Sequence, residues 1–380
     1  MNAATNEYLK QKFSDYYQKA IIDTPTALEQ REWGFIFFDQ SAEVRMKRHV
    51  AFSTRDEVEN YIKSMIPRHV YYSTAYYALP SAGTMQDKIW SGADLIFDLD
   101  ADHIVRGSYD EMLERVKEET LKIIDMLTHE LGFSQKDINL VFSGGRGYHL
   151  HIKNLEVRGW TSAERREIVD YVCGTGLDPE IMLRERKSME IKGWPARYRN
   201  SIIEYLQALR KSERDEAIKK ISSIKGIGKD SADDFLKSSG GLINRLKKPE
   251  KKIIINRVLR AIVTQEESGF AEILKEKAAL TDEPVTTDIK RLIRMPGSLH
   301  GGSGFRVLNI SIKELESFDP LIDAVFFGEN PIKINAAFGL TMPILGNKYS
   351  VEKGINSVPE ALGVFLCARG IAEYAGGGKK

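Results

Sequence analysis

The sequence contains little cysteine. Its 380 residues include only two, Cys173 and Cys367, without the spacing of a metal site or a disulfide framework. It has no run of about 20 apolar residues, which excludes a membrane-spanning helix. Its polar first 17 residues lack the apolar stretch of a signal peptide. We therefore expect a cytoplasmic protein that keeps its thiols reduced.

The chain also lacks an excess of charge of one sign. Its 55 Lys and Arg nearly balance its 54 Asp and Glu, for a net charge of +1. No overall basic field therefore indicates a nucleic-acid partner. Three local basic patches exist, at 45–49, 197–199 and 245–252. Each is equally compatible with an ordinary solvated face, so the patches alone do not decide the matter.

Length and pattern predict two units built from helices and strands. Apolar, aromatic and β-branched runs predict strands at 33–38, 48–52, 70–77, 95–100, 138–142 and 148–152. Helical periodicity covers 111–131 and ends at Gly132. We expect an α/β (α+β) fold with mixed sheets flanked by helices. Its predicted parts are a core of 1–155 with 280–345, a mostly helical insert of 156–279, and a C-terminal segment of 346–380 with a flexible tail.

Two acids on one predicted strand form the strongest chemical signal. Side chains alternate along a strand, so Asp98 and Asp100 share one face while Phe97 and Leu99 face the core. Adjacent carboxylates repel unless a cation joins them, and Mg²⁺ binds such oxygen pairs together with substrate phosphates. The alternative is a strand end with two solvated acids.

A glycine-rich turn between two predicted strands supplies a second signal. Residues 143–147 read SGGRG, and glycines let successive backbone N–H groups approach an anion. Arg146 adds a planar fork suited to phosphate. His149 and His151 follow on one strand face. A tight hairpin with incidental polar residues would show the same pattern.

A second basic, glycine-containing stretch runs from Arg291 to Arg306, just after Asp282 and Asp288. It is a weaker phosphate signal. The chain has no Walker A loop, no zinc-protease HExxH and no GxSxG nucleophile elbow. Carboxylates combined with phosphate-binding residues therefore indicate metal-assisted phosphoryl or nucleotidyl transfer.

Six blocks in order make the chain resemble the catalytic (small) subunit of archaeal and eukaryotic DNA primase. They are REWGF at 31–35, RH at 48–49, PRHVYYS at 67–73, FDLD at 97–100, SGGRGYH at 143–149 and PGSLH at 296–300. The resemblance spans roughly residues 30–310. Each block is a modest signal by itself, and their order makes the resemblance strong.

The resemblance implies a role for each matching residue. Asp98, Asp100 and a third acid would hold two Mg²⁺ or Mn²⁺ ions. The third acid would be Asp282, with Asp288 as the alternative. The incoming triphosphate would be bound by Ser143, Arg146, His149 and His300. Glu32 and Arg48 match positions in the active-site cleft.

Two departures from the family pattern change these expectations. Relatives often carry a zinc knuckle near the first catalytic acids, but the segment from Asp102 to Tyr109 that follows them here contains no cysteine, so we expect no structural zinc. Many relatives also have Lys where this chain has Gly302. Phosphate neutralisation would then fall more on Arg146, Arg294 or Arg306.

The family implies template-directed synthesis of short RNA primers on single-stranded DNA from NTPs, with DNA synthesis also open. It further implies a heterodimer with a large primase subunit. Lys- and Glu-rich helices are typical of archaeal proteins, which would place the chain at the nucleoid. The alternatives are a related polymerase of end-joining repair, a two-metal nuclease, and a DNA-binding scaffold without catalysis. Sequence does not separate Mg²⁺ from Mn²⁺ or locate the large-subunit interface.

The helical insert contains one further motif. Residues 224–236, IKGIGKDSADDFL, resemble the hairpin of a helix-hairpin-helix element. In such elements, backbone N–H groups near the glycines contact DNA phosphates without reading sequence. A glycine turn between two packed helices is the plainer interpretation of Gly226 and Gly228.

Overall fold

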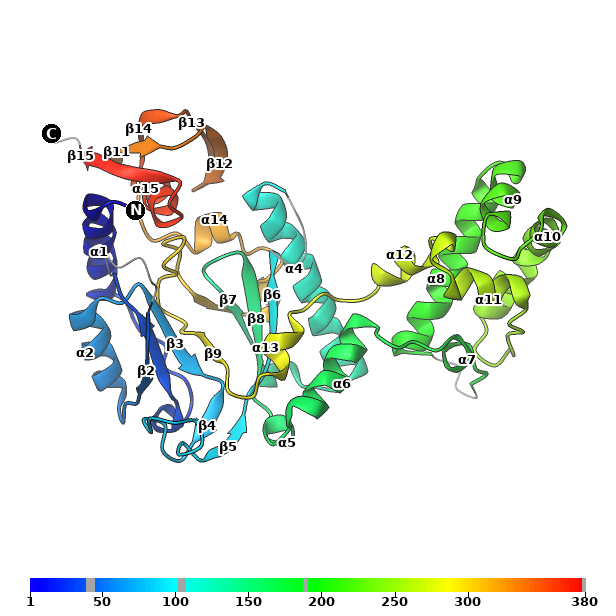
Figure 1. The fold of residues 1–380 in the computed structure, drawn as a ribbon, viewed down its shortest axis with the longest axis horizontal. Helices are drawn as coiled ribbons and strands as arrows, with labels where there is room; N and C mark the ends of the chain where they lie inside the picture. Colours follow the sequence, from blue (N-terminus) through cyan, green and yellow to red (C-terminus); the bar gives the residue numbers. More distant parts are fainter. Residues whose placement is uncertain (39–44, 102–106, 187–190, 378–380) are drawn as a thin grey trace. The chain divides into compact units, whose positions relative to one another are not determined.

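The computed structural model describes residues 1–38, 45–101, 107–186 and 191–377. They fall into two compact units (Figure 1). Unit 1 comprises Met1–Thr120, Phe133–Glu167 and Thr281–Lys380, and unit 2 comprises Leu121–Gly132 and Ile168–Leu280. Within the described ranges, no helix is both long and apolar enough to cross a membrane.

Unit 1 is built on two four-stranded antiparallel sheets. The first has the order β2-β1-β3-β9 and the second β10-β7-β8-β6. The strands of the first sheet are β1 (Trp33–Ile36), β2 (Met46–Val50), β3 (His69–Ser73) and β9 (Leu292–Arg294). Those of the second are β6 (Leu95–Asp100), β7 (Ile138–Phe142), β8 (Gly147–Ile152) and β10 (Leu308–Ile310). β9 and β10 come from the chain after the insert, so each sheet joins both parts of the core.

Smaller sheets and helices surround these two sheets (Figure 1). The strands are β4 (Ala75–Tyr77) with β5 (Trp90–Ala93), β12 (Leu340–Ile344) with β13 (Asn347–Val351), and β11 (Pro331–Ala336) between β14 (Gly354–Pro359) and β15 (Ala372–Gly377). The helices are α1 (Ala3–Tyr17), α2 (Arg55–Met65), α4 (Tyr109–Asp125), α5 (Leu155–Arg158), α6 (Ser162–Cys173), α13 (Glu283–Thr287), α14 (Pro320–Asp323) and α15 (Glu360–Ala368). The predicted α+β class is confirmed.

Local differences from the predicted elements have identifiable causes. The run 70–77 is not one strand, because the backbone leaves β3 at Thr74, whose N–H donates to the Arg291 carbonyl at 2.8 Å. β4 then pairs in another sheet. The predicted helix 111–131 is α4 followed by a wider π-helical turn, Met126–Glu130, and it ends at Gly132 with φ +78°.

The C-terminal segment was predicted as a part separate from the core. In the structure β13, β14, α15 and β15 belong to unit 1. The reason is burial, since every residue of α15 from Ala361 to Ala368 is buried. Residues 378–380 of the predicted tail lie outside the described residues.

Unit 2 is helical and has its own apolar core. Its helices are the ends of α4 and α6, α7 (Pro179–Met182), α8 (Gly193–Lys211), α9 (Arg214–Ser222), α10 (Lys229–Leu246), α11 (Arg257–Thr264) and α12 (Phe270–Lys275). Their buried side chains form one cluster. The predicted helical insert, 156–279, overlaps most of this unit. The turn at Gly226 and Gly228 joins α9 to α10, with Gly226 at φ +82° and Gly228 as the N-cap of α10. DNA binding by this turn stays a prediction.

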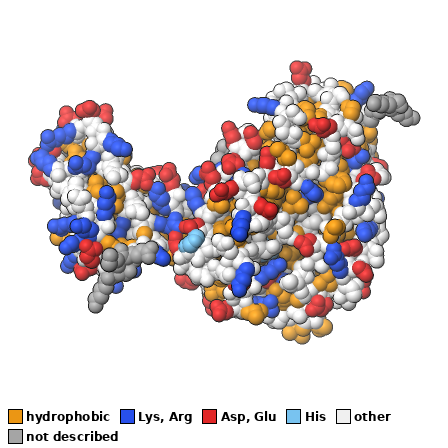
Figure 2. Space-filling model, turned by 180° about the vertical axis from the view of Figure 1, so that it is seen from behind, with side chains coloured by type: hydrophobic (Ala, Val, Ile, Leu, Met, Phe, Trp, Pro, Cys, Tyr) orange, Lys and Arg blue, Asp and Glu red, His pale blue; other side chains and the backbone are white. Residues whose placement is uncertain are grey.

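The basic patch at 197–199 has a structural explanation. Arg197 pairs with the Glu130 carboxylate, and Arg199 is buried, donating to the carbonyls of Leu183 and Arg184 at 3.2 and 3.0 Å. On the face seen in Figure 2, Lys and Arg side chains are interspersed with Asp and Glu over both units. This distribution agrees with the near-zero net charge.

Candidate active site

The pairing of β6 with β8 sets the centre of the site. Asp98 stands opposite His149 and Asp100 opposite Gly147. Phe97 and Leu99, which alternate with the acids, are fully buried. The Nε2 atom of His149 lies 3.4 Å from Oδ1 of Asp98. The two acids therefore share one face of the sheet, as the sequence predicts.

Asp282 joins this pair through the backbone. Its N–H donates to the Asp98 carbonyl at 2.9 Å, and the Thr281 hydroxyl donates to the same carbonyl at 3.0 Å. Burial, together with the charges of Asp100 and Asp282, raises the pKa of Asp98 to about 7. Asp288 instead accepts a hydrogen bond from the Lys290 N–H at 2.9 Å. Asp282 is thus the acid that lies with Asp98 and Asp100.

The carboxylates fit a divalent ion in a particular way. In the described part of the chain, no group of three or more His, Cys, Asp or Glu side chains is arranged so that it could hold a metal ion without other ligands. Mg²⁺ commonly uses one or two carboxylates and completes its shell with water and substrate phosphates. The repulsion that raises the pKa of Asp98 is the interaction that a cation would relieve. The donor set therefore suits an ion shared with a bound phosphate.

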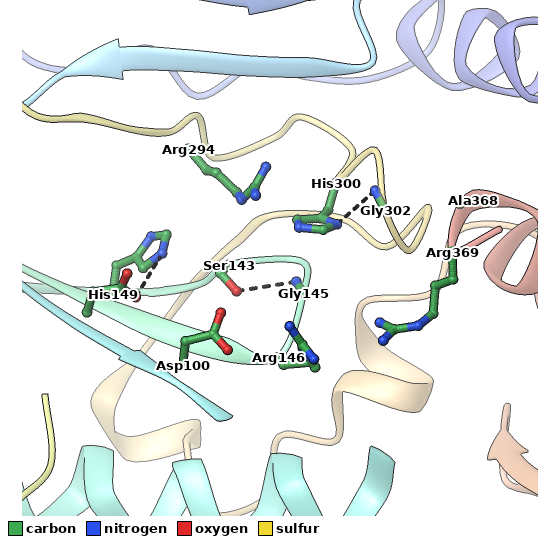
Figure 3. Close-up of a pocket in the computed structure, with 11 residues that line it drawn as sticks. Asp100, Ser143, Gly145, Arg146, His149, Arg294, His300, Gly302, Ala368 and Arg369 are labelled. Atoms are coloured by element: carbon green, nitrogen blue, oxygen red, sulfur yellow. Dashed lines mark hydrogen bonds and ion pairs between the residues drawn. The ribbon is translucent and has the colours of Figure 1, made fainter. Parts of the chain in front are cut away.

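The turn between β7 and β8 depends on its glycines. Gly144 has φ +74°, which L side chains rarely adopt. A Cβ on Gly147 would lie 2.0 Å from the Leu99 carbonyl oxygen, so only glycine lets β8 approach β6 here. The Gly145 N–H donates to the Ser143 hydroxyl at 3.3 Å. The turn places Ser143, Gly145 and Arg146 beside the carboxylates (Figure 3).

The opposite wall comes from β9 and the turn that follows it. Nη1 of Arg294 lies 2.7 Å from Nδ1 of His69 and 3.1 Å from the Tyr71 hydroxyl. His69 has its pKa lowered to about 2 by burial and by Arg294 and Arg68, so it is neutral and its Nδ1 accepts from the Arg294 guanidinium. This contact fixes the direction in which Arg294 points.

His300 is oriented by its own turn. Its Nδ1 accepts from the Gly302 N–H at 3.1 Å, so Nε2 carries the ring hydrogen. Burial, with help from Arg294, lowers the pKa of His300 well below its usual range. Nε2 faces the glycine turn between β7 and β8, residues 143–147, since a Cβ on Gly145 would lie 3.1 Å from this nitrogen. Gly302, which departs from the family pattern, thus contributes its N–H to the orientation of His300.

These groups enclose one cavity of about 460 Å³ (Figure 3). It is lined by Asp98, Asp100, Ser143, Gly145, Arg146, His149, Arg294, His300, Gly302, Ala368 and Arg369. Seven of these are residues singled out from the sequence. Arg369 was missed, because it belongs to no motif and reaches the site only through the packing of α15.

A second cavity of about 410 Å³ adjoins the first and shares Asp98, His149 and Arg294 with it. Its other polar lining residues are Arg48, Tyr71, Asp288, Lys290 and Arg291. Arg291 is the first residue of the basic stretch described from the sequence, and Lys290 directly precedes it.

Glu32 and Arg48 lie together beside this second cavity. Arg48 lines it, whereas Glu32 is fully buried behind it. Arg48 donates to both oxygens of Glu32, at 3.0 and 3.1 Å. Glu32 is thereby the residue that orients Arg48.

Arg306 is the predicted phosphate ligand that the structure places elsewhere. Its backbone pairs with Leu299, and the alternation of this extended stretch buries Phe305 and Val307 on one side. Arg306 points to the other side, where its guanidinium donates to the Asp323 carbonyl. It lines neither cavity.

Comparison with known proteins identifies the family of the chain. The family model of the DNA primase small subunit matches residues 97–312. The chain is 53% identical to the DNA primase small subunit PriS of Methanoregula boonei over 99% of this chain and 100% of the relative. It is 52% identical to that of Methanocorpusculum labreanum and 54% identical to that of Methanosphaerula palustris, each with 99% and 100% covered. The chain belongs to the DNA primase small subunit family.

Proposed function

We propose that the chain is the catalytic subunit of a DNA primase and synthesises short RNA primers on single-stranded DNA. The observation that supports this most directly is the larger cavity, in which Asp98 and Asp100 face a set of phosphate-binding groups, with Asp282 joined to Asp98 through the backbone. A nucleoside triphosphate requires both, since its reacting phosphate needs a cation and its leaving pyrophosphate needs fixed positive charge. The membership of the family supports the same reaction.

The triphosphate is bound in the larger cavity in this proposal. Arg146 and Arg294 neutralise its charge from opposite walls, and the Nε2–H of His300 donates to a phosphate oxygen. Ser143 and the N–H groups of the glycine turn complete the contact. Neutral His149, which lies against Asp98, steadies that carboxylate and adds no charge of its own.

Asp98, Asp100 and Asp282 would hold Mg²⁺ or Mn²⁺, which would lower the pKa of the attacking hydroxyl and neutralise the leaving group. The protein then needs no nucleophile of its own, in keeping with two cysteines that lie outside both cavities. The second cavity meets the first at Asp98, so the 3′ end of the growing strand enters there. Arg48, held by Glu32, and Arg291 would contact its phosphates.

The partners follow from the same proposal. They are a single-stranded DNA template, NTPs, and a large primase subunit, which the name of the relatives implies. A DNA-binding scaffold without catalysis would not need the conjunction of acids and phosphate-binding groups, and a nuclease would not need the triphosphate-binding turn.

The test is incorporation of labelled ATP on unprimed single-stranded DNA with Mg²⁺ or Mn²⁺. We expect short products from the wild type and none from Asp98→Ala/Asp100→Ala. The matched control is Glu266→Ala/Glu267→Ala, which removes two adjacent exposed acids of unit 2. If only an annealed primer is extended, initiation depends on the partner. Absence of labelled product on both templates would reject a polymerase and leave a DNA-binding scaffold without catalysis.

A further inference from the structure

The C-terminal end of α15 forms part of the wall of the larger cavity. α15 is buried from Ala361 to Ala368, and Arg369, its C-cap, is the first exposed residue after it. Ala368 and Arg369 both line the cavity. Both lie beyond residue 312, where the match to the family model ends.

One arginine fixes this end of α15 to the candidate active site. Nε of Arg68 donates to the Gly301 carbonyl at 2.9 Å, and its Nη2 donates to the Ala368 carbonyl at 3.2 Å. Gly301 directly follows His300 in the turn described above. Arg68 therefore couples the position of Arg369 to that of His300.

An aromatic surface directs the Arg369 side chain. Its guanidinium carbon lies 5.2 Å from the centroid of the Tyr109 ring and 5.4 Å from that of Phe365. The Tyr109 hydroxyl donates to the Gly145 carbonyl at 2.5 Å, so the supporting ring is itself attached to the glycine turn. Figure 3 shows Arg369 extending from α15 toward Arg146.

The charge of Arg369 has no carboxylate partner among the described residues. Among the other cations at the two cavities, Arg48 pairs with Glu32, whereas Arg294 contacts His69 and the Tyr71 hydroxyl. Arg369 is held on aromatic rings and faces a cavity that other arginines also line. Without a carboxylate partner, such an arginine is suited to an anionic ligand.

We propose that Arg369 is a third arginine of the triphosphate site and contacts the terminal phosphates opposite Arg294. The inference deepens the proposed function and rests on it. A bound NTP would bridge the glycine turn, the His300 turn and the end of α15. The C-terminal segment is then part of the substrate site and not only a structural support.

The experiment compares binding of ATP and of AMP by calorimetry in the presence of Mg²⁺, using the full-length wild type, Arg369→Ala and Arg369→Lys. Loss of a charge-assisted contact predicts ATP affinity at least about 10-fold weaker for Arg369→Ala. Lys should restore part of it, and affinity for AMP should stay unchanged. In the incorporation assay, KM for NTP should rise with kcat within about twofold.

The matched control is Arg158→Ala. The Arg158 guanidinium also stacks on a tyrosine, 4.1 Å from the Tyr76 ring centroid, but lines neither cavity. Arg158→Ala should bind ATP with the affinity of the wild type. Equal ATP affinity in Arg369→Ala and wild type would overturn the inference alone. Absence of ATP binding in the wild type would instead overturn the proposed function and the inference with it.

Discussion

Asp98 is a carboxyl group held among like charges. It sits on a buried strand beside Asp100 and Asp282, and His149 approaches it as a neutral ring because burial lowers the pKa of His149 to about 3. Nearby Arg291 and Arg294 offset only part of the cost of its charge. Without a cation, the ionised form of Asp98 therefore destabilises the fold.

This gives a prediction for the stability of the metal-free protein. The pKa of Asp98 is about 7 in the folded state, above its ordinary 3.8, so folding favours the protonated form. The stability contributed by this group is present at low pH and is lost as pH rises toward and through 7. In EDTA, Asp98→Asn should melt a few degrees above the wild type at pH 8, and this difference should shrink toward pH 5.

The control variant is Glu316→Gln, an exposed acid, which should match the wild type at both pH values. Mn²⁺ should raise the melting temperature of the wild type at pH 8 and leave Asp98→Asn unchanged. A melting difference between Asp98→Asn and wild type that does not vary with pH would contradict this account of the site.

The decisive elements are β6 and β8, which pair closely at Gly147. β6 carries both acids, and β8 begins at Gly147, directly opposite Asp100. Because the glycine turn and the carboxylates are joined by this pairing, the spacing between cation ligands and phosphate ligands is set by a single strand register. A shift of this register would displace both the cation ligands and the phosphate ligands.

Gly147→Ala should therefore affect both stability and binding. The added Cβ would lie 2.0 Å from the Leu99 oxygen, and relief requires β8 to move away from β6. We expect a loss of about 1–3 kcal/mol or more in unfolding free energy, together with weaker ATP binding, measured by urea denaturation and calorimetry. Gly159→Ala, whose Cβ would meet nothing within 4 Å, should stay within about 0.5 kcal/mol. Wild-type behaviour of Gly147→Ala would refute the register argument.

At the scale of the molecule, the two units have separate cores, and both cavities lie in one of the units. Every residue of both cavities belongs to unit 1. Unit 2 buries its own cluster, in which the Phe270 ring packs 5.5 and 6.2 Å from the rings of Tyr198 and Tyr205. Damage to the core of unit 2 should therefore remain within that unit.

Phe270→Ala tests this independence. Removal of a fully buried ring should cost unit 2 about 3–5 kcal/mol. Hydrogen exchange should accelerate in α8 and α10 while β6 and β8 keep their protection, and ATP affinity should not change. Phe338→Ala, which removes an exposed ring of unit 1, is the control. Equal loss of protection in β6 and β8 would mean that the units unfold together.

Local pattern alone was enough to predict much of this protein. Strand alternation placed Asp98 and Asp100 on one face, because a period of two depends only on backbone geometry. The glycines at 144–147 marked a tight turn, since few other residues adopt that backbone. The ordered blocks, all close in sequence to their strands, indicated the family that the comparisons confirm.

Only the tertiary structure decided contacts between distant segments. It placed Asp282 against the end of β6 and Asp288 at the neighbouring cavity, although both precede the same basic stretch. It turned Arg306 away from the cavity and brought in Arg369 from α15. Sequence spacing does not report which face of a late segment packs on an early one, because that choice is made by burial of the whole core.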